Sequence, residues 1–193
     1  MPLRREHLPL LEKDWSFGNP ASTGDGIRAE VAGSGALTIS QSGSIISSGG
    51  KGISAHASQG AISVTATGAV EASDNALSLR ADTGNVTVAQ TGAILSHNGN
   101  GIDMEAPSGS VTLTGAGTIE GKAYGVRLRS TGNSSTSTSF THNSGTITAT
   151  TGTGIDASAS QGAVTVENHA DVSAGGTGIR VETMGNQTAA TVR

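Results

Sequence analysis

The sequence has no cysteine and very few aromatic or charged residues. Aromatics make up 2% and charged residues 13% of its 193 residues, with one Trp, one Tyr and two Phe. The lack of cysteine excludes disulfide bonds and thiolate metal sites. The scarcity of large side chains argues against an ordinary globular core, so any core is expected to be narrow and filled with Ile, Val and Ala.

The charge balance and hydropathy exclude two further classes of partner. The net charge is -4, so the sequence predicts no basic surface for nucleic acid. No apolar run approaches the length of a membrane span. The first residues also lack the apolar central region of a signal peptide, so an exported parent protein is expected to contain this chain as a mature fragment.

What the sequence has in abundance is short runs in which apolar and small polar residues alternate. Within 52–81 the apolar pairs are Ile53/Ala55, Ile62/Val64 and Val70/Ala72. Alternation with a period of two is typical of half-buried strands, and glycine or small polar residues separate the three runs. Each such unit therefore predicts three short strands joined by tight corners.

The three-strand unit recurs along the chain. The first-strand core positions, which recur at steps of 24 to 29 residues, are Ile27, Ile53, Leu77, Ile102, Val126, Ile155 and Ile179. Second-strand pairs run from Leu37/Ile39 to Val164/Val166, and third-strand positions from Ile45 to Val172. A repeat of this length predicts a solenoid, and parallel connections are almost always right-handed. We therefore predict an all-β fold: a right-handed parallel β-helix with three strands per coil, about 25 residues per coil and six to seven coils.

Glycine recurs at the corner before the third strand. It stands two residues before the core position at Gly43, Gly68, Gly92, Gly117 and Gly145. Such a corner predicts either a positive φ or a close approach of stacked backbones, both of which favour glycine.

The outward positions of the first strands carry most of the charge. The predicted register places Arg80, Glu105 and Arg129 in one column, and a second column holds Asp103, Arg127, Asp156 and Arg180. Opposite charges on neighbouring strands help to fix register, although exposed pairs contribute only about 0–1 kcal/mol each. We interpret these columns as a solvated ladder; the alternative is an acid cluster that binds or cleaves polysaccharide.

Outward positions of the second strands predict a ladder of hydroxyl groups instead. It consists of Thr38, Ser63, Thr87, Thr112, Ser139, Thr165 and Thr191, and Ala89, Glu167 and Arg193 interrupt the neighbouring column. A flat array of hydroxyls raises the alternative of an ice-binding solenoid. Thr and Ser are also ordinary outward residues of a parallel sheet.

Two segments depart from the repeat. Extra polar residues in 130–137 predict a loop that bulges from a corner, and its Asn133 and Ser134 are candidates for partner contact because loops on rigid scaffolds often bind. A tolerated insertion is the alternative. Residues 1–23 hold large apolar side chains and are expected to form an N-terminal cap or a leader, whereas 24–193 form the repeats.

No catalytic motif stands out, and no cofactor or metal is expected. The five histidines lack metal-ligand spacing, and stacking would bring only His142 and His169 into successive corners, where we expect unrelated exposed side chains. The candidate partner surface therefore consists of Asp103, Glu105, Arg127, Arg129, Asp156, Asn133 and Ser134.

The segments Gly154–Ile179 and Gly52–Ser73 share the pattern Gly-Ile-x-Ala, Gly-x-Val-x-Val and Gly-x-Ile-x-Ala, wholly or in part. This pattern resembles the passenger-domain repeats of bacterial type V autotransporters over about residues 24–193. The resemblance implies a secreted β-helical stalk on, or released from, a Gram-negative surface, which often serves adhesion or virulence. It implies proteins or glycans of host or neighbouring cells as partners, and self-association between rods.

The same resemblance places the membrane barrel of such a protein outside this chain, so contact with the membrane is expected only through that barrel. The shared residues are core and corner positions, so no functional residue is carried over. The chain is expected to be non-enzymatic.

Overall fold

The computed structural model describes residues 23–133, 135–185 and 189–193. All the regular secondary structure in these residues is β-strand. The first strands of successive coils are β1 (Ile27–Val31), β4 (Ile53–Ala57), β7 (Leu77–Ala81), β10 (Ile102–Ala106), β12 (Tyr124–Ser130), β14 (Thr153–Ala159) and β17 (Ile179–Thr183). The second strands are β2 (Leu37–Gln41), β5 (Ile62–Ala66), β8 (Val86–Gln90), β11 (Val111–Gly121), β13 (Thr138–Ala149), β15 (Val164–Asn168) and β18 (Ala190–Val192).

The third strands are short, and two of them merge with their predecessors. They are β3 (Ile45–Ser47), β6 (Val70–Ala72), β9 (Ile94–Ser96) and β16 (Asp171–Ala174). In the coils between β9 and β16, β11 and β13 continue through the corner and supply both the second and the third strand. Three strands per coil are therefore confirmed, although two of the corners are passed without a break.

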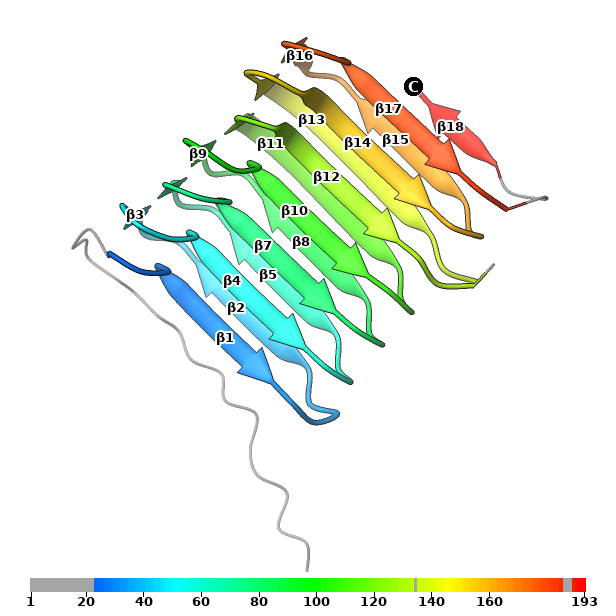
Figure 1. Cartoon of the computed structure of the whole chain (residues 1–193), viewed down its shortest axis with the longest axis horizontal. Coiled ribbons are helices and arrows are strands. Elements are labelled where there is room, and N and C mark those ends of the chain that lie inside the picture. Colours follow the sequence, from blue (N-terminus) through cyan, green and yellow to red (C-terminus); the bar gives the residue numbers. More distant parts are fainter. Residues whose placement is uncertain (1–22, 134, 186–188) are drawn as a thin grey trace, which may run out of the picture.

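All the strand pairs are parallel and join equivalent positions of successive coils. The first strands form a seven-stranded sheet in the order β1-β4-β7-β10-β12-β14-β17, and Ile53 pairs with Ile27 on one side and with Leu77 on the other. In Figure 1 the front strands point to the lower right, the strands behind them run back, and successive coils advance from β1 at the lower left to β17 at the upper right, which is a right-handed winding. The predicted right-handed parallel β-helix is confirmed.

The inward side chains stack into one continuous apolar column. Ile53, Leu77 and Ile102 are fully buried, and so is Phe140, the largest residue of the column. Burial of each aliphatic side chain contributes about 1.5–3 kcal/mol, which offsets the entropy of ordering so many small residues. The predicted in-and-out alternation of burial holds along the rod, except at the outward Asp156, which is buried, and in the last coil, where Ile179 and Val192 are exposed.

The glycine corners are tight mainly because backbones approach one another. Among the described residues, only Gly117 and Gly145 have a positive φ, of 93° and 107°. A Cβ at Gly92 would lie 1.9 Å from the carbonyl oxygen of Gly68, so the stacked corner has no room for a side chain. Of the two reasons predicted for glycine, close approach therefore applies at more of these corners.

Side chains also bind the corners to one another, which the sequence analysis did not predict. Asn75 Oδ1 accepts a hydrogen bond of 2.8 Å from the backbone nitrogen of Asn100, and Asn85 Oδ1 accepts one of 2.8 Å from Ser110. These bonds satisfy backbone groups that the short strands leave unpaired at the turns. The predicted N-terminal cap, apart from Thr23, lies outside the described residues.

Candidate binding surfaces

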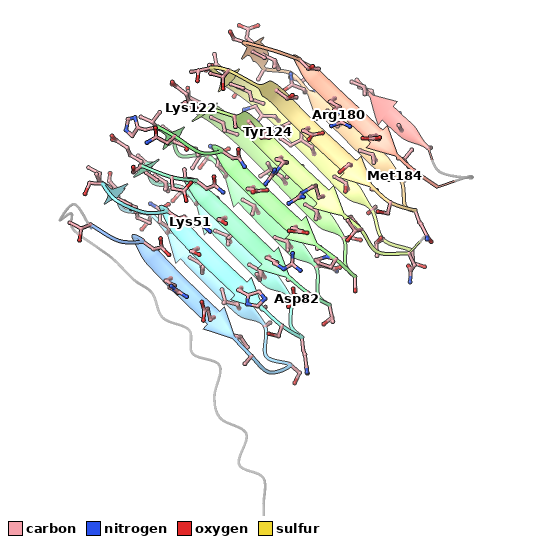
Figure 2. The ribbon with its side chains drawn as sticks, in the orientation of Figure 1. Lys51, Asp82, Lys122, Tyr124, Arg180 and Met184 are labelled. Carbon is pink, nitrogen blue, oxygen red and sulfur yellow. The ribbon has the colours of Figure 1, made fainter. Side chains whose placement is uncertain are left out.

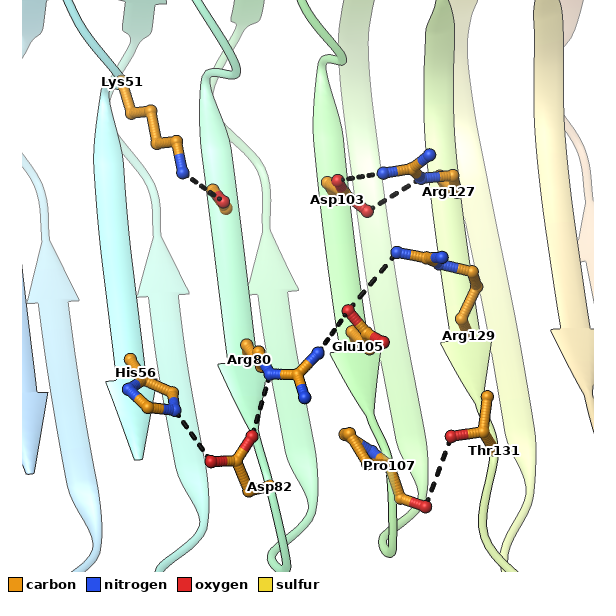
Figure 3. Close-up of polar contacts among 11 residues, drawn as sticks. Lys51, His56, Arg80, Asp82, Asp103, Glu105, Pro107, Arg127, Arg129 and Thr131 are labelled. Carbon is orange, nitrogen blue, oxygen red and sulfur yellow. Dashed lines mark hydrogen bonds and ion pairs between the residues drawn. The ribbon is translucent and has the colours of Figure 1, made fainter. Parts of the chain in front are cut away.

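The outward side of the seven-stranded sheet, from β1 to β17, is the charged face of the rod (Figure 2). Glu105 lies between two arginines of neighbouring strands, as predicted: its Oε2 is 2.8 Å from Arg80 Nη1 and 3.3 Å from Arg129 Nη2. The chain of contacts continues from Arg80 to Asp82 (2.8 Å) and from Asp82 to His56 (3.0 Å), as Figure 3 shows. Five charged or titratable groups thus connect four coils.

The second column contains a tighter pair. Arg127 donates two hydrogen bonds to Asp103, with Nε at 3.0 Å and Nη2 at 2.5 Å from its oxygens (Figure 3). The Asn100 amide donates a further bond of 3.2 Å to Asp103, and the guanidinium of Arg127 lies 5.1 Å from the centre of the Tyr124 ring. The hydrogen bonds to Asp103 raise the pKa of Arg127, and the two side chains are only 25% and 14% exposed. This bidentate pair is held more firmly than an exposed ion pair.

Asp156 lies in the predicted column, between Arg127 and Arg180, but forms an ion pair with neither. Its carboxylate forms no hydrogen bond or ion pair within the described part of the chain, because Arg127 faces Asp103 and Arg180 bonds to Glu182 at 2.6 Å. The residue is 7% exposed, and burial raises the pKa of its carboxyl although the arginines oppose this shift. The column keeps its predicted order of alternating charges, but ion pairing between neighbouring coils stops after Arg127.

The inserted loop lies at the corner between β12 and β13. Asn133 organises it: its Oδ1 accepts a 3.0 Å bond from the nitrogen of Ser135, and its carbonyl accepts bonds of 3.0 and 2.7 Å from Thr136. Its hydrogen bonds are therefore all local, and none reaches the charged columns. Ser134 lies outside the described residues.

The outward side of β2, β5, β8, β11, β13 and β15 is the hydroxyl face. The register aligns the column predicted from the sequence: Thr38, Ser63, Thr87, Thr112, Ser139, Thr165 and Thr191. A second column follows two residues later, with Ser40, Thr65, Ala89, Thr114, Thr141 and Glu167. Charged residues stand only at the C-terminal end of these two columns, Glu167 and, in the next coil, Arg193, so the rest of the two columns is uncharged.

Polar side chains also point inward at the corner behind the hydroxyl face, and the sequence analysis missed them. Their amide or imidazole nitrogens donate to nearby backbone carbonyls: Gln41 to Gly43, Gln90 to Gly92, His142 to Gly117 at 3.0 Å and Asn168 to Ala170 at 2.7 Å. The available signal was their position, two residues after a buried core residue, where alternation predicts an inward side chain.

The two corner histidines have different surroundings. His142 is fully buried and its ring stacks on Phe140 at 5.9 Å, whereas His169 is exposed and lies 3.2 Å from Glu167. The prediction of an exposed side chain is therefore right for His169 and wrong for His142. Only their backbones meet, through a 2.8 Å bond from the nitrogen of His169 to the carbonyl of His142.

Neither a metal cluster nor a membrane helix is found in the part of the chain that the structure describes. No three His, Cys, Asp or Glu side chains come together there in a way that would bind a metal ion. No helix in the same residues has the length and hydropathy to cross a bilayer. The acids of the candidate surface, apart from Asp156, are instead bound to arginines.

These observations define a right-handed parallel β-solenoid with one charged and one hydroxyl face. No protein-family model, no curated protein and no solved structure compared with the chain matches it.

Proposed function

We propose that this chain is the β-helical stalk of a bacterial type V autotransporter, located at the cell surface or released from it. In this role it is a non-enzymatic adhesin or virulence factor, and its outer faces bind proteins or glycans of host or neighbouring cells. The rod supplies stiffness, and its outward side chains supply recognition.

The observation that carries the proposal is the pairing of the charged face. Glu105 is bound by two arginines and Asp103 by one, so these acids act as fixed parts of a patterned surface. General acid–base catalysis needs a carboxylate that reaches its substrate, whereas the one acid of the candidate surface without a basic partner, Asp156, is buried. This arrangement supports a binding surface over the alternative of polysaccharide cleavage.

The hydroxyl face favours a second candidate, an ice-binding rod. Its hydroxyls repeat about 4.8 Å apart along the rod and about 7 Å apart along each strand, which is a regular two-dimensional lattice on a plane that is uncharged except at its C-terminal end. Such a lattice can order water in the pattern of an ice surface. Ala89, Glu167 and Arg193 interrupt it.

A single set of outward variants tests the proposal. Beads coated with the purified chain are expected to adhere to host-cell monolayers or to a glycan array. Arg129→Glu on the charged face and Thr114→Glu on the hydroxyl face are compared, and adhesion should fall at least tenfold for one of them while both rods stay folded.

Two results would contradict the proposal. One is cleavage of an acidic polysaccharide that is abolished by Asp103→Asn or Glu105→Gln. The other is thermal hysteresis that is abolished by Thr114→Glu without any adhesion, which would favour the ice-binding candidate.

A further inference from the structure

Two buried polar atoms converge beside Gly115, inside the corner behind the hydroxyl face. The register places Gly115 between Gln90 of the preceding coil and His142 of the next one. A Cβ at Gly115 would lie 2.7 Å from Gln90 Oε1 and 2.8 Å from His142 Nδ1. Both atoms therefore face the same space, which exists because residue 115 has no side chain.

Neither atom has a hydrogen-bond partner among the described residues. Gln90 is 1% and His142 0% exposed, so bulk water does not reach these side chains. A buried polar atom without a partner costs about 1–3 kcal/mol, so two of them in one space require an explanation.

The hydrogen bonds that the two side chains do make define the chemistry of the free atoms. The amide nitrogen of Gln90 donates to the Gly92 carbonyl, which leaves its Oε1, an acceptor, beside Gly115. His142 Nε2 lies 3.0 Å from the Gly117 carbonyl and must carry a hydrogen to bond with it. Burial lowers the pKa of His142 and so favours the neutral imidazole, in which Nδ1 then has only a lone pair.

Two acceptors cannot bond to each other, but a molecule with two hydrogens satisfies both. We propose that one water molecule binds between Gln90 Oε1 and His142 Nδ1, and donates one hydrogen to each. The two acceptors flank the position that a side chain of residue 115 would occupy, and internal waters typically occupy such polar gaps. Rotating the Gln90 amide is not an equivalent solution, because its oxygen would then face the Gly92 carbonyl.

A crystal structure at a resolution that shows ordered water tests the proposal directly. A water peak is expected within about 2.7–3.2 Å of both Gln90 Oε1 and His142 Nδ1. In Gly115→Ala the new methyl group should remove this peak and lower the melting temperature, whereas Gly33→Ala, where a Cβ meets nothing within 4 Å, should change neither. No peak in the unmodified chain, or a Gln90 amide that donates directly to His142, would overturn the proposal.

A second measurement applies even if Gly115→Ala does not fold. The nitrogen-15 chemical shift of His142 Nδ1 in the unmodified chain should be that of an unprotonated nitrogen that accepts a hydrogen bond. The same shift should move toward the value of a free acceptor in Gln90→Met, because loss of one acceptor loosens the water. A protonated Nδ1, or an Nδ1 already at the value of a free acceptor, would contradict the bound water.

Discussion

The charged face and the hydroxyl face belong to two different parallel sheets that enclose the same apolar column, yet their outward side chains interact differently. On the charged face, Arg127 and Asp103 join neighbouring coils with two hydrogen bonds. On the hydroxyl face, Thr87 and Thr112 lie in register without a bond between their side chains. The comparison teaches that the second-strand ladder keeps its register without side-chain bonds across this pair, so the core beneath it is sufficient there, whereas the charged face adds bonds of its own.

The largest expected effect tests whether the core behind the hydroxyl face specifies the coil. Val88 is buried in the second-strand ladder, where it pairs with Val64 and Leu113. Val88→Asp puts an unpaired carboxylate into that column at a cost of several kcal/mol, so the rod should unfold. Thermal melts followed by circular dichroism measure the loss of folded structure in this variant.

The matched control is the adjacent outward residue. Thr87→Asp places the same carboxylate in water and should melt within a few degrees of the unmodified chain. Equal melting temperatures of the two variants would refute the assignment of inward and outward residues.

The next effect separates the two faces. Asp103→Asn removes the charged partner of Arg127 and should lower the free energy of unfolding by about 1–2 kcal/mol, with a smaller loss in high salt. Thr112→Ala on the hydroxyl face should change it by less than about 0.5 kcal/mol. Equal losses in a denaturant titration would mean that the ion pairs of the charged face contribute nothing specific.

Asp156 is the position on the charged face where ion pairing between neighbouring coils stops. Burial raises the pKa of its carboxyl, so the carboxyl ionises less readily in the folded than in the unfolded chain. The stability of the fold therefore falls as pH rises above about 4, where the unfolded chain ionises. Asp156→Asn should therefore stabilise the rod by about 1 kcal/mol at neutral pH.

This gain should vanish below about pH 4, where the carboxyl is protonated in the folded and the unfolded chain. Melting temperatures of both proteins between pH 3 and 7 show whether it does. A variant less stable than the unmodified chain at pH 7 would mean that Arg127 and Arg180 stabilise the ionised carboxylate after all.

A further effect, which disappears at neutral pH, concerns the interior behind the hydroxyl face. Burial lowers the pKa of His142 below its ordinary value, so the unfolded chain takes up a proton first as pH falls. Stability is fully present above about pH 6.5 and declines below it, by at most about 1.4 kcal/mol per pH unit. His142→Gln should remove this decline, because a glutamine side chain does not take up a proton. Glutamine also fits such a corner, since Gln41 and Gln90 donate to carbonyls at equivalent positions.

Unfolding by denaturant at pH 7.5 and pH 5 measures the contribution of His142. The exposed pair of His169 and Glu167 supplies the control variant, His169→Gln, which should keep the decline. An unchanged pH dependence in His142→Gln would mean that the imidazole is not desolvated in the fold.

The sequence predicted the fold and the register because both follow from the positions of the aliphatic residues. Once Ile62 and Val86 are assigned inward, every neighbour in the ladder and the order of both outer columns are determined. The hydroxyl column and the Arg80–Glu105–Arg129 column followed without error.

The candidate surface was predicted less completely, because side-chain torsions choose among partners that the register places at equal distance. Arg127 has an acid on each side and bonds only to Asp103, where Asn100 and Tyr124 add contacts. The alternation of residues in the sequence does not predict which of the two acids Arg127 binds. Asp156 is left without a partner as a result. The inward Gln90 and His142 were overlooked because polar residues are ordinarily assigned to the outside.

Distances between spin labels test the coil itself most directly, and the absence of native cysteine makes the labels unique. Thr38→Cys is combined with Ser139→Cys, four coils away in the hydroxyl column, or with Thr165→Cys, five coils away. Parallel coils predict label separations of about 19 Å and about 24 Å, a difference of one strand spacing. Separations that do not increase from the first pair to the second would contradict the stacked parallel solenoid and, with it, the proposed stalk.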